Sequence, residues 1–171
     1  NNATSAWGYD TIYAVDVDSD NAVVDNNVII ANGKDYIYGL IVSGNNFTIS
    51  NNAIQAESDN YANGIDVEGP AEGIVDSNVI ALTSPISTYG IYAAMSNGNV
   101  SVDYINNTIR ADSYAAFGIE LGGIESNVAY NTIELNGNYT TGIAANLDSL
   151  IINDNEIIVN GSGVGNEYVW D

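Results

Sequence analysis

Carboxyl groups are the only abundant side chains in this sequence that could do acid–base or metal chemistry. The chain has 171 residues, with 22 Asp and Glu but only two basic residues, Lys34 and Arg110, and it has no His and no Cys. The missing residue types exclude imidazole general-base catalysis, Ser-His and Cys-His nucleophiles, thiolate metal sites and disulfide bonds. Any reaction or metal site would therefore depend on Asp and Glu.

The densest acidic run consists of Asp16, Asp18 and Asp20 at alternate positions. This spacing resembles the first ligand positions of a calcium-binding loop. However, Asn21 stands where such a loop has Gly, and Asn27 stands where it has its final Glu. Strand alternation alone would place Asp16 and Asp18 on one solvated face. Weak calcium binding and a plain acidic surface both stay open, and we expect no other cofactor.

The elements that position these side chains follow an internal repeat. Segments of the form Asn-x-Ile align without gaps at intervals of 25, 26, 29, 24 and 24 residues. A further segment at Asn2 fits the same alignment, with Thr4 in the isoleucine position. The identical positions are Asn27, Asn52, Asn78, Asn107, Asn131 and Asn155, and, two residues later, Ile29, Ile54, Ile80, Ile109, Ile133 and Ile157.

A second column lies upstream of each asparagine and predicts short strands. Its members are each followed by apolar residues at the next and third positions, which is the period of a strand with one buried face. They are Ala14, Gly39, Gly64, Gly90, Gly118 and Gly142. Further short strands are expected just before and just after each asparagine. Three short strands in about 25 residues exclude helical repeats and predict one turn of a parallel β-solenoid.

We therefore expect an all-β fold, a single-stranded parallel β-helix of about six to seven coils of 24 to 29 residues each. Residues 1–171 form one domain, interpreted as a segment of a longer repeat protein or as a filament subunit. Successive coils would stack about 4.8 Å apart, so identical side chains would form ladders. Asparagine suits such a ladder because it tolerates the left-handed conformation of a sharp bend, and its amide can bond both neighbouring coils.

The alternation of Gly-Ile-x-x with Asn-Asn-x-Ile resembles the right-handed parallel β-helix repeats of the pectate-lyase-like superfamily. The richness in Asn, Ile and Tyr with almost no basic residues is most similar to the repeats of adhesin-like surface proteins of methanogenic archaea. The resemblance covers essentially the whole chain. It implies the β-helix fold, but not one function, because the superfamily includes polysaccharide lyases and glycoside hydrolases as well as surface proteins.

Acids alternate with uncharged residues in the aligned column two places after the glycines. The column contains Asp16, Ile41, Asp66, Tyr92, Glu120 and Ala144. Successive acids would lie two coils, or about 10 Å, apart. Glycoside hydrolysis needs a closer pair, about 5 to 9 Å apart, with one raised pKa. This spacing favours dispersed surface charge over an active site, so we expect a non-enzymatic protein.

The two basic residues each align with an acid of the next coil. Arg110 falls beside Glu134 and Lys34 beside Asp59. We interpret both as surface ion pairs, each contributing at most about 1 kcal/mol to stability.

An aromatic column lies immediately before the glycines. It contains Tyr13, Tyr38, Asn63, Tyr89, Phe117 and Thr141. Stacked rings in a solenoid usually rigidify a turn, but an exposed row of rings could also stack on sugars. The sequence leaves both interpretations open.

The net charge of −20 argues against nucleic acid and anionic lipid as partners. No apolar run approaches the roughly 20 residues needed to cross a bilayer, so we expect no direct membrane insertion. Asn-x-Ser/Thr sequons are compatible with a glycosylated extracellular protein at the cell surface. The sequons lie at Asn2, Asn46, Asn99, Asn106, Asn138 and Asn160.

The sequence predicts a structural or adhesion module that acts as a rigid spacer or assembles end to end with other copies or adjacent repeats. Glycans or another cell surface are further candidate partners. The alternative function is a β-helix that binds or cleaves a neutral polysaccharide. A groove with several aromatic rings and a close carboxyl pair would favour this alternative.

Overall fold

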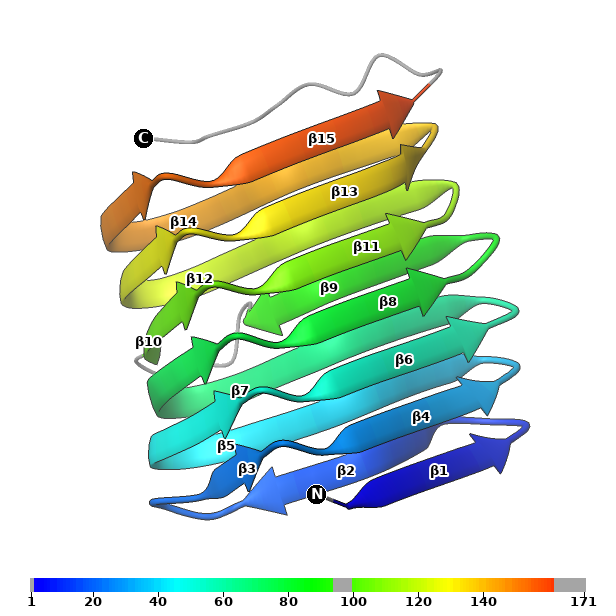
Figure 1. The fold of residues 1–171 in the computed structure, drawn as a ribbon, viewed down its shortest axis with the longest axis horizontal. Coiled ribbons are helices and arrows are strands. Elements are labelled where there is room, and N and C mark those ends of the chain that lie inside the picture. Colours follow the sequence, from blue (N-terminus) through cyan, green and yellow to red (C-terminus); the bar gives the residue numbers. More distant parts are fainter. Residues whose placement is uncertain (1, 94–99, 162–171) are drawn as a thin grey trace.

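The computed structural model describes residues 2–93 and 100–161 as a parallel β-solenoid of about six turns (Figure 1). Two sheets form its walls, and β1 and β15 lie at opposite ends of the stack. The described residues contain no helix, and therefore none that could cross a membrane. The predicted fold class is confirmed.

The short-strand sheet carries the strands that follow the asparagine ladder. Its order is β1 (Ala3–Gly8), β4 (Val28–Gly33), β6 (Ala53–Ser58), β8 (Val79–Thr83), β11 (Thr108–Asp112), β13 (Thr132–Gly137) and β15 (Glu156–Gly161).

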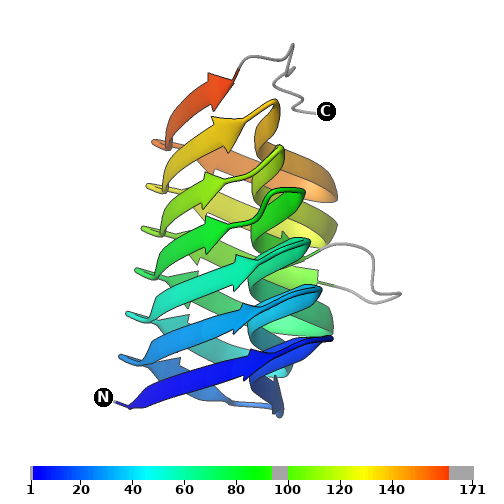
Figure 2. The same ribbon diagram turned by 90° about the vertical axis from the view of Figure 1, so that its right-hand side faces the viewer.

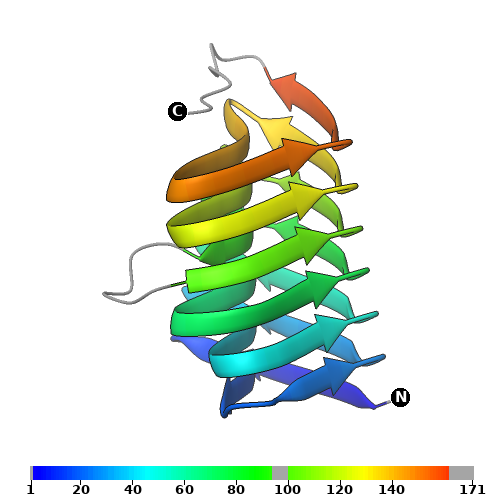
Figure 3. The same cartoon turned by 90° about the vertical axis from the view of Figure 1, so that its left-hand side faces the viewer.

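The long-strand sheet forms the rest of each coil, and Figures 2 and 3 show its strands bending round the side of the solenoid. Four of its strands join two predicted short strands into one of 15 or 16 residues, because pairing between coils continues round the bend. Its members are β2 (Ile12–Asp18), β3 (Val23–Asp25), β5 (Tyr36–Ser50), β7 (Tyr61–Asp76), β9 (Ser87–Ala93), β10 (Val100–Ile105), β12 (Ala115–Ala129) and β14 (Tyr139–Asn153).

Identical side chains stack in the interior as predicted. The ladder isoleucines pair in register from Ile29 to Ile157, and Thr4 pairs with Ile29 in the first coil. From Ile29 to Ile133 these isoleucines are at most 2% exposed. Stacking therefore buries an apolar column that no single coil could cover.

The asparagine ladder is continuous from Asn27 to Asn155. At its centre, the backbone N–H and the Nδ2 of Asn52 both donate to Oδ1 of Asn78, each at 3.0 Å. Asn78 Nδ2 in turn donates to Oδ1 of Asn107 at 3.1 Å and to the Ile49 carbonyl at 3.0 Å. Because these buried amides are satisfied by neighbouring coils, each coil depends on the next.

The left-handed bend lies one residue earlier than expected. The ladder asparagines are not among the residues with positive φ; the residue before each of them is, with φ between 52° and 58°. These corner residues are Asn26, Asn51, Ser77, Asn106, Tyr130 and Asp154. The bend at the corner turns the following amide into the interior, which is what the ladder requires.

Glycine is required where the long strands bend. A Cβ at Gly90 would lie 2.5 Å from the Gly118 carbonyl oxygen and 2.5 Å from Cγ2 of Ile109. Gly64 is equally crowded by Gly90 and Ile80. These positions therefore leave no room for a side chain.

We expect Asn78→Ala to lower the free energy of unfolding by about 3 to 5 kcal/mol, because it removes the side-chain bonds described above and leaves buried partners unsatisfied. Asn27→Ala is the matched control. Asn27 is only partly buried at the edge of the ladder, so its loss should cost about 1 kcal/mol. Urea unfolding measures both, and equal costs would contradict a cooperative buried ladder.

Candidate functional site

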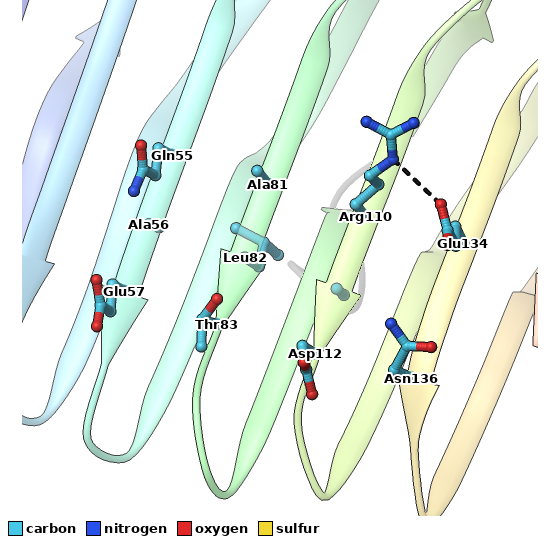
Figure 4. Close-up of a pocket in the computed structure, with 11 residues that line it drawn as sticks. Gln55, Ala56, Glu57, Ala81, Leu82, Thr83, Arg110, Asp112, Glu134 and Asn136 are labelled. Carbon is cyan, nitrogen blue, oxygen red and sulfur yellow. Dashed lines mark hydrogen bonds and ion pairs between the residues drawn. The ribbon is translucent and has the colours of Figure 1, made fainter. Parts of the chain in front are cut away.

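A shallow hollow of about 220 Å³ lies on the outer face of the short-strand sheet (Figure 4). It exists because Ala81 is small and stands in register between Gln55 and Arg110. Nε of Arg110 donates to Oε2 of Glu134 at 3.1 Å, and the two side chains are 67% and 38% exposed. The predicted pair is thus confirmed as a solvated surface contact, and the hollow holds no closely paired acids.

Lys34 makes a different contact from the one expected. Its Nζ lies 5.0 Å from the centre of the Tyr9 ring in the preceding coil. Within residues 2–93 and 100–161, Arg110–Glu134 is the only ion pair. The predicted Lys34–Asp59 pair is therefore wrong: at this turn the ammonium group lies over an aromatic face instead.

The acidic run consists of Asp16, Asp18 and Asp20, and two of these carboxylates already accept hydrogen bonds from the next coil. Asp18 Oδ1 accepts from Oγ of Ser43 at 2.8 Å, and Asp20 Oδ1 accepts from the backbone N–H of Asn45 at 2.7 Å. In the described part of the chain, no three acids converge closely enough to hold a metal ion. Calcium binding here stays a prediction.

The aromatic column forms a nearly continuous array on the outer face of the long-strand sheet. Tyr13 and Tyr38 have ring centres 5.1 Å apart, and Tyr89 and Phe117 stack at 4.6 Å. Asn63 interrupts the column between Tyr38 and Tyr89.

Tyr61 fills the gap that Asn63 leaves. Its ring centre lies 6.0 Å from that of Tyr38 and 5.3 Å from that of Tyr89. Because those two residues flank Asn63 in register, the Tyr61 ring lies over Asn63, which is fully buried. The array therefore runs from Tyr13 to Phe117 with one ring supplied from outside the column.

Asp66 lies beside this array, three residues after Asn63 on the same strand. Asn63 Nδ2 donates to Asp66 Oδ2 at 3.1 Å, whereas the buried Asn63 Oδ1 has no hydrogen-bond partner. Asp66 is only 9% exposed, so its predicted place on a dispersed, solvated charge column is wrong. We call the outer face formed by Tyr61, Asn63, Asp66, Tyr92 and Glu120 the Asp66 surface.

Burial raises the pKa of Asp66 to about 7, and the negative charge of Glu68 adds to the effect. Burial also raises the pKa of Glu120. The register places Tyr92 between Asp66 and Glu120, so these acids lie about 10 Å apart. Glu68 is nearer, two residues along the same strand, or roughly 7 Å.

The sequence analysis did not predict the Asp66 surface. The column alignment located Asp66 and the break at Asn63, but not the ring that covers them. The signal was available in Tyr61, an aromatic residue two positions before the only polar break between the tyrosines of the column.

The predicted ladder residues lie in the interior, and the predicted sequons lie outside. Asn2, Asn46, Asn106, Asn138 and Asn160 are all exposed, while Asn99 lies outside the described residues. Glycosylation at these positions stays a prediction.

Comparison of the chain with protein-family models, with curated proteins and with solved structures found no match. The function of the Asp66 surface must therefore be inferred from the residues of this chain.

We expect Asp66→Asn to stabilise the protein by about 2 to 4 kcal/mol at pH 8. The pKa of Asp66 rises from 3.8 to about 7 on folding, so the folded wild type binds the extra proton between these values. Its stability therefore falls as pH rises from about 4 to about 7 and is level above. The Asn side chain of the variant carries no charge, so the stability of the variant does not fall over this pH range.

Urea unfolding at pH 5 and pH 8 measures the difference, with the exposed Asp112→Asn as the control. Burial raises the pKa of the tyrosines near Asp66, so they stay neutral throughout; these are Tyr38, Tyr61, Tyr92 and Tyr104. An advantage of Asp66→Asn that is the same at both pH values would contradict a desolvated carboxyl group.

Proposed function

We propose that the chain is a non-enzymatic structural module of an extracellular, cell-surface protein, where it acts as a rigid spacer. The observation that carries this proposal is the asparagine ladder, which ties the coils together from Asn27 to Asn155. Seven stacked strands at about 4.8 Å give a rod on the order of 30 Å long. Because the ladder amides are hydrogen-bonded from coil to coil, the rod resists bending between coils.

Surface chemistry supports an extracellular location. The net charge is −20, and the sequons at Asn46, Asn106 and Asn138 lie on exposed positions where a glycan would not disturb the core. The resemblance of the repeats to pectate-lyase-like β-helices, and to adhesin-like proteins of methanogenic archaea, is consistent with this role.

We further propose that coils stack end to end, on adjacent repeats or on another copy. The interior column is uncovered at β15, where Ile157 is 38% and Val159 37% exposed. The equivalent Ile133 and Leu135, one coil earlier, are fully buried. Among residues 2–93 and 100–161, β15 pairs only with β13, and a strand edge beside an exposed apolar column favours addition of a further strand.

Two neighbouring substitutions test this stacking. Ile157→Lys places a charge in the interior column, and we expect it to abolish concentration-dependent association in sedimentation velocity. Ile158→Lys is the matched control, because Ile158 pairs with Glu134 on the outer face. A wild type that stays monomeric at high concentration would rule out self-assembly and leave only the spacer role.

A second candidate function is binding or cleavage of a neutral polysaccharide. The aromatic array from Tyr13 to Phe117 favours binding, since sugar rings stack on such faces. The raised pKa of Asp66 beside the charge of Glu68 favours a general acid.

A glycan panel assayed for both binding and cleavage separates these functions. The spacer proposal predicts no cleavage product with any neutral or acidic glycan. Cleavage that is lost in Asp66→Asn but kept in Asp112→Asn would overturn it in favour of the second candidate. Binding without cleavage, lost in Tyr89→Ala and kept in the exposed Tyr114→Ala, would instead support an adhesion role.

A further inference from the structure

We propose that the Asp66 surface binds a linear polyamine, with one ammonium group paired to Asp66, a second paired to Glu120, and the methylene chain between them lying on Tyr92. The inference goes beyond the spacer role and does not depend on it.

The first argument is that Asp66 has no basic partner among the described residues; its carboxylate accepts a hydrogen bond from the neutral Asn63 amide. The chain has only two basic residues. Arg110 is paired with Glu134 on the short-strand sheet, and Lys34 lies over Tyr9. Buried carboxylates in proteins are normally paired with a cation. No basic residue is left to pair with the ionised form of Asp66, so a cation that pairs with it comes from outside the chain.

The second argument is the unpartnered Asn63 Oδ1. It is buried beside Asp66, and its own amide nitrogen already donates to the carboxylate. An amide oxygen and a carboxylate, both acceptors, therefore lie side by side at the Asp66 surface. An ammonium ion, with up to three N–H donors and no acceptor, is complementary to this pair. Entry requires rotation of the half-buried Tyr61 ring, which covers Asn63.

Aromatic faces distinguish an organic cation from a metal ion. Tyr61 and Tyr89 have ring centres 5.3 Å apart, and Tyr89 packs edge to face on Tyr92 at 5.3 Å. Such faces attract alkylammonium groups through cation–π contacts. Calcium instead takes six to eight oxygen ligands, and no cluster of three acids occurs within the described ranges.

The order of side chains along the Asp66 surface selects a linear ligand with separated charges. Asp66, Tyr92 and Glu120 stand in register on three successive strands, so an acid, a ring and an acid follow one another. The acids are about 10 Å apart. A polyamine presents the same alternation of charge, methylenes and charge. A monoamine would engage only one of the acids.

Isothermal titration of the full chain with spermidine in about 0.15 M salt, where loose surface attraction is screened, tests the proposal. We expect one saturable site, weakened at least about tenfold by Asp66→Asn and by Glu120→Gln. Tyr92→Ala should weaken it severalfold. Asp112→Asn makes the same charge change on the other sheet and should leave the affinity within about twofold.

Melting curves check that each variant is folded, and Asp66→Asn is expected to be at least as stable as the wild type. Nuclear Overhauser contacts between spermidine methylenes and the Tyr92 ring give an independent readout. Equal losses in Asp66→Asn and Asp112→Asn would show general attraction to an acidic surface and overturn the proposal. Displacement of spermidine by calcium at equal charge concentration would overturn it in favour of a metal site.

Discussion

The hydrogen-bonded column of asparagine amides is the interaction on which the rest of this structure depends. Each coil exposes one inward amide that only another coil can satisfy, so no coil is stable by itself. Once the amides are stacked, the isoleucines two residues later are brought into line, and the interior fills without large side chains having to interlock. The polar column thus sets the register that the apolar column requires.

Much of this architecture could be predicted from the sequence, because in a solenoid the spacing of identical residues is also their spatial arrangement. The Asn-x-Ile columns, the glycine column and the Arg110–Glu134 contact all follow from alignment alone. Details that depend on backbone torsion were not accessible. The left-handed residue lies before each ladder asparagine, and at one corner it is Tyr130, which no propensity scale would select.

The Asp66 surface shows a second limit. Alignment treats each column as independent, but the Tyr61 ring contacts Tyr36 in its own column and also Tyr38 and Tyr89 in the neighbouring one. Asp66, which the alignment placed on a solvated face, is buried. This outcome depends on the volume of side chains in two neighbouring coils. In the same way, the contact of Lys34 with Tyr9 depends on where the turn directs a flexible side chain. Departures from strict repetition therefore identify the positions where side chains make contacts that the repeat does not predict.

The ladder also gives the rod a direction. Along the column, each ladder asparagine from Asn27 to Asn131 donates its side-chain N–H to Oδ1 of the ladder asparagine in the coil that follows. The amide dipoles are therefore parallel, and neighbouring bonds polarise one another in the same sense. One end of the column is an acceptor end and the other a donor end. Two rods can continue the column only when they join head to tail. All rods in such an assembly would therefore point in the same direction.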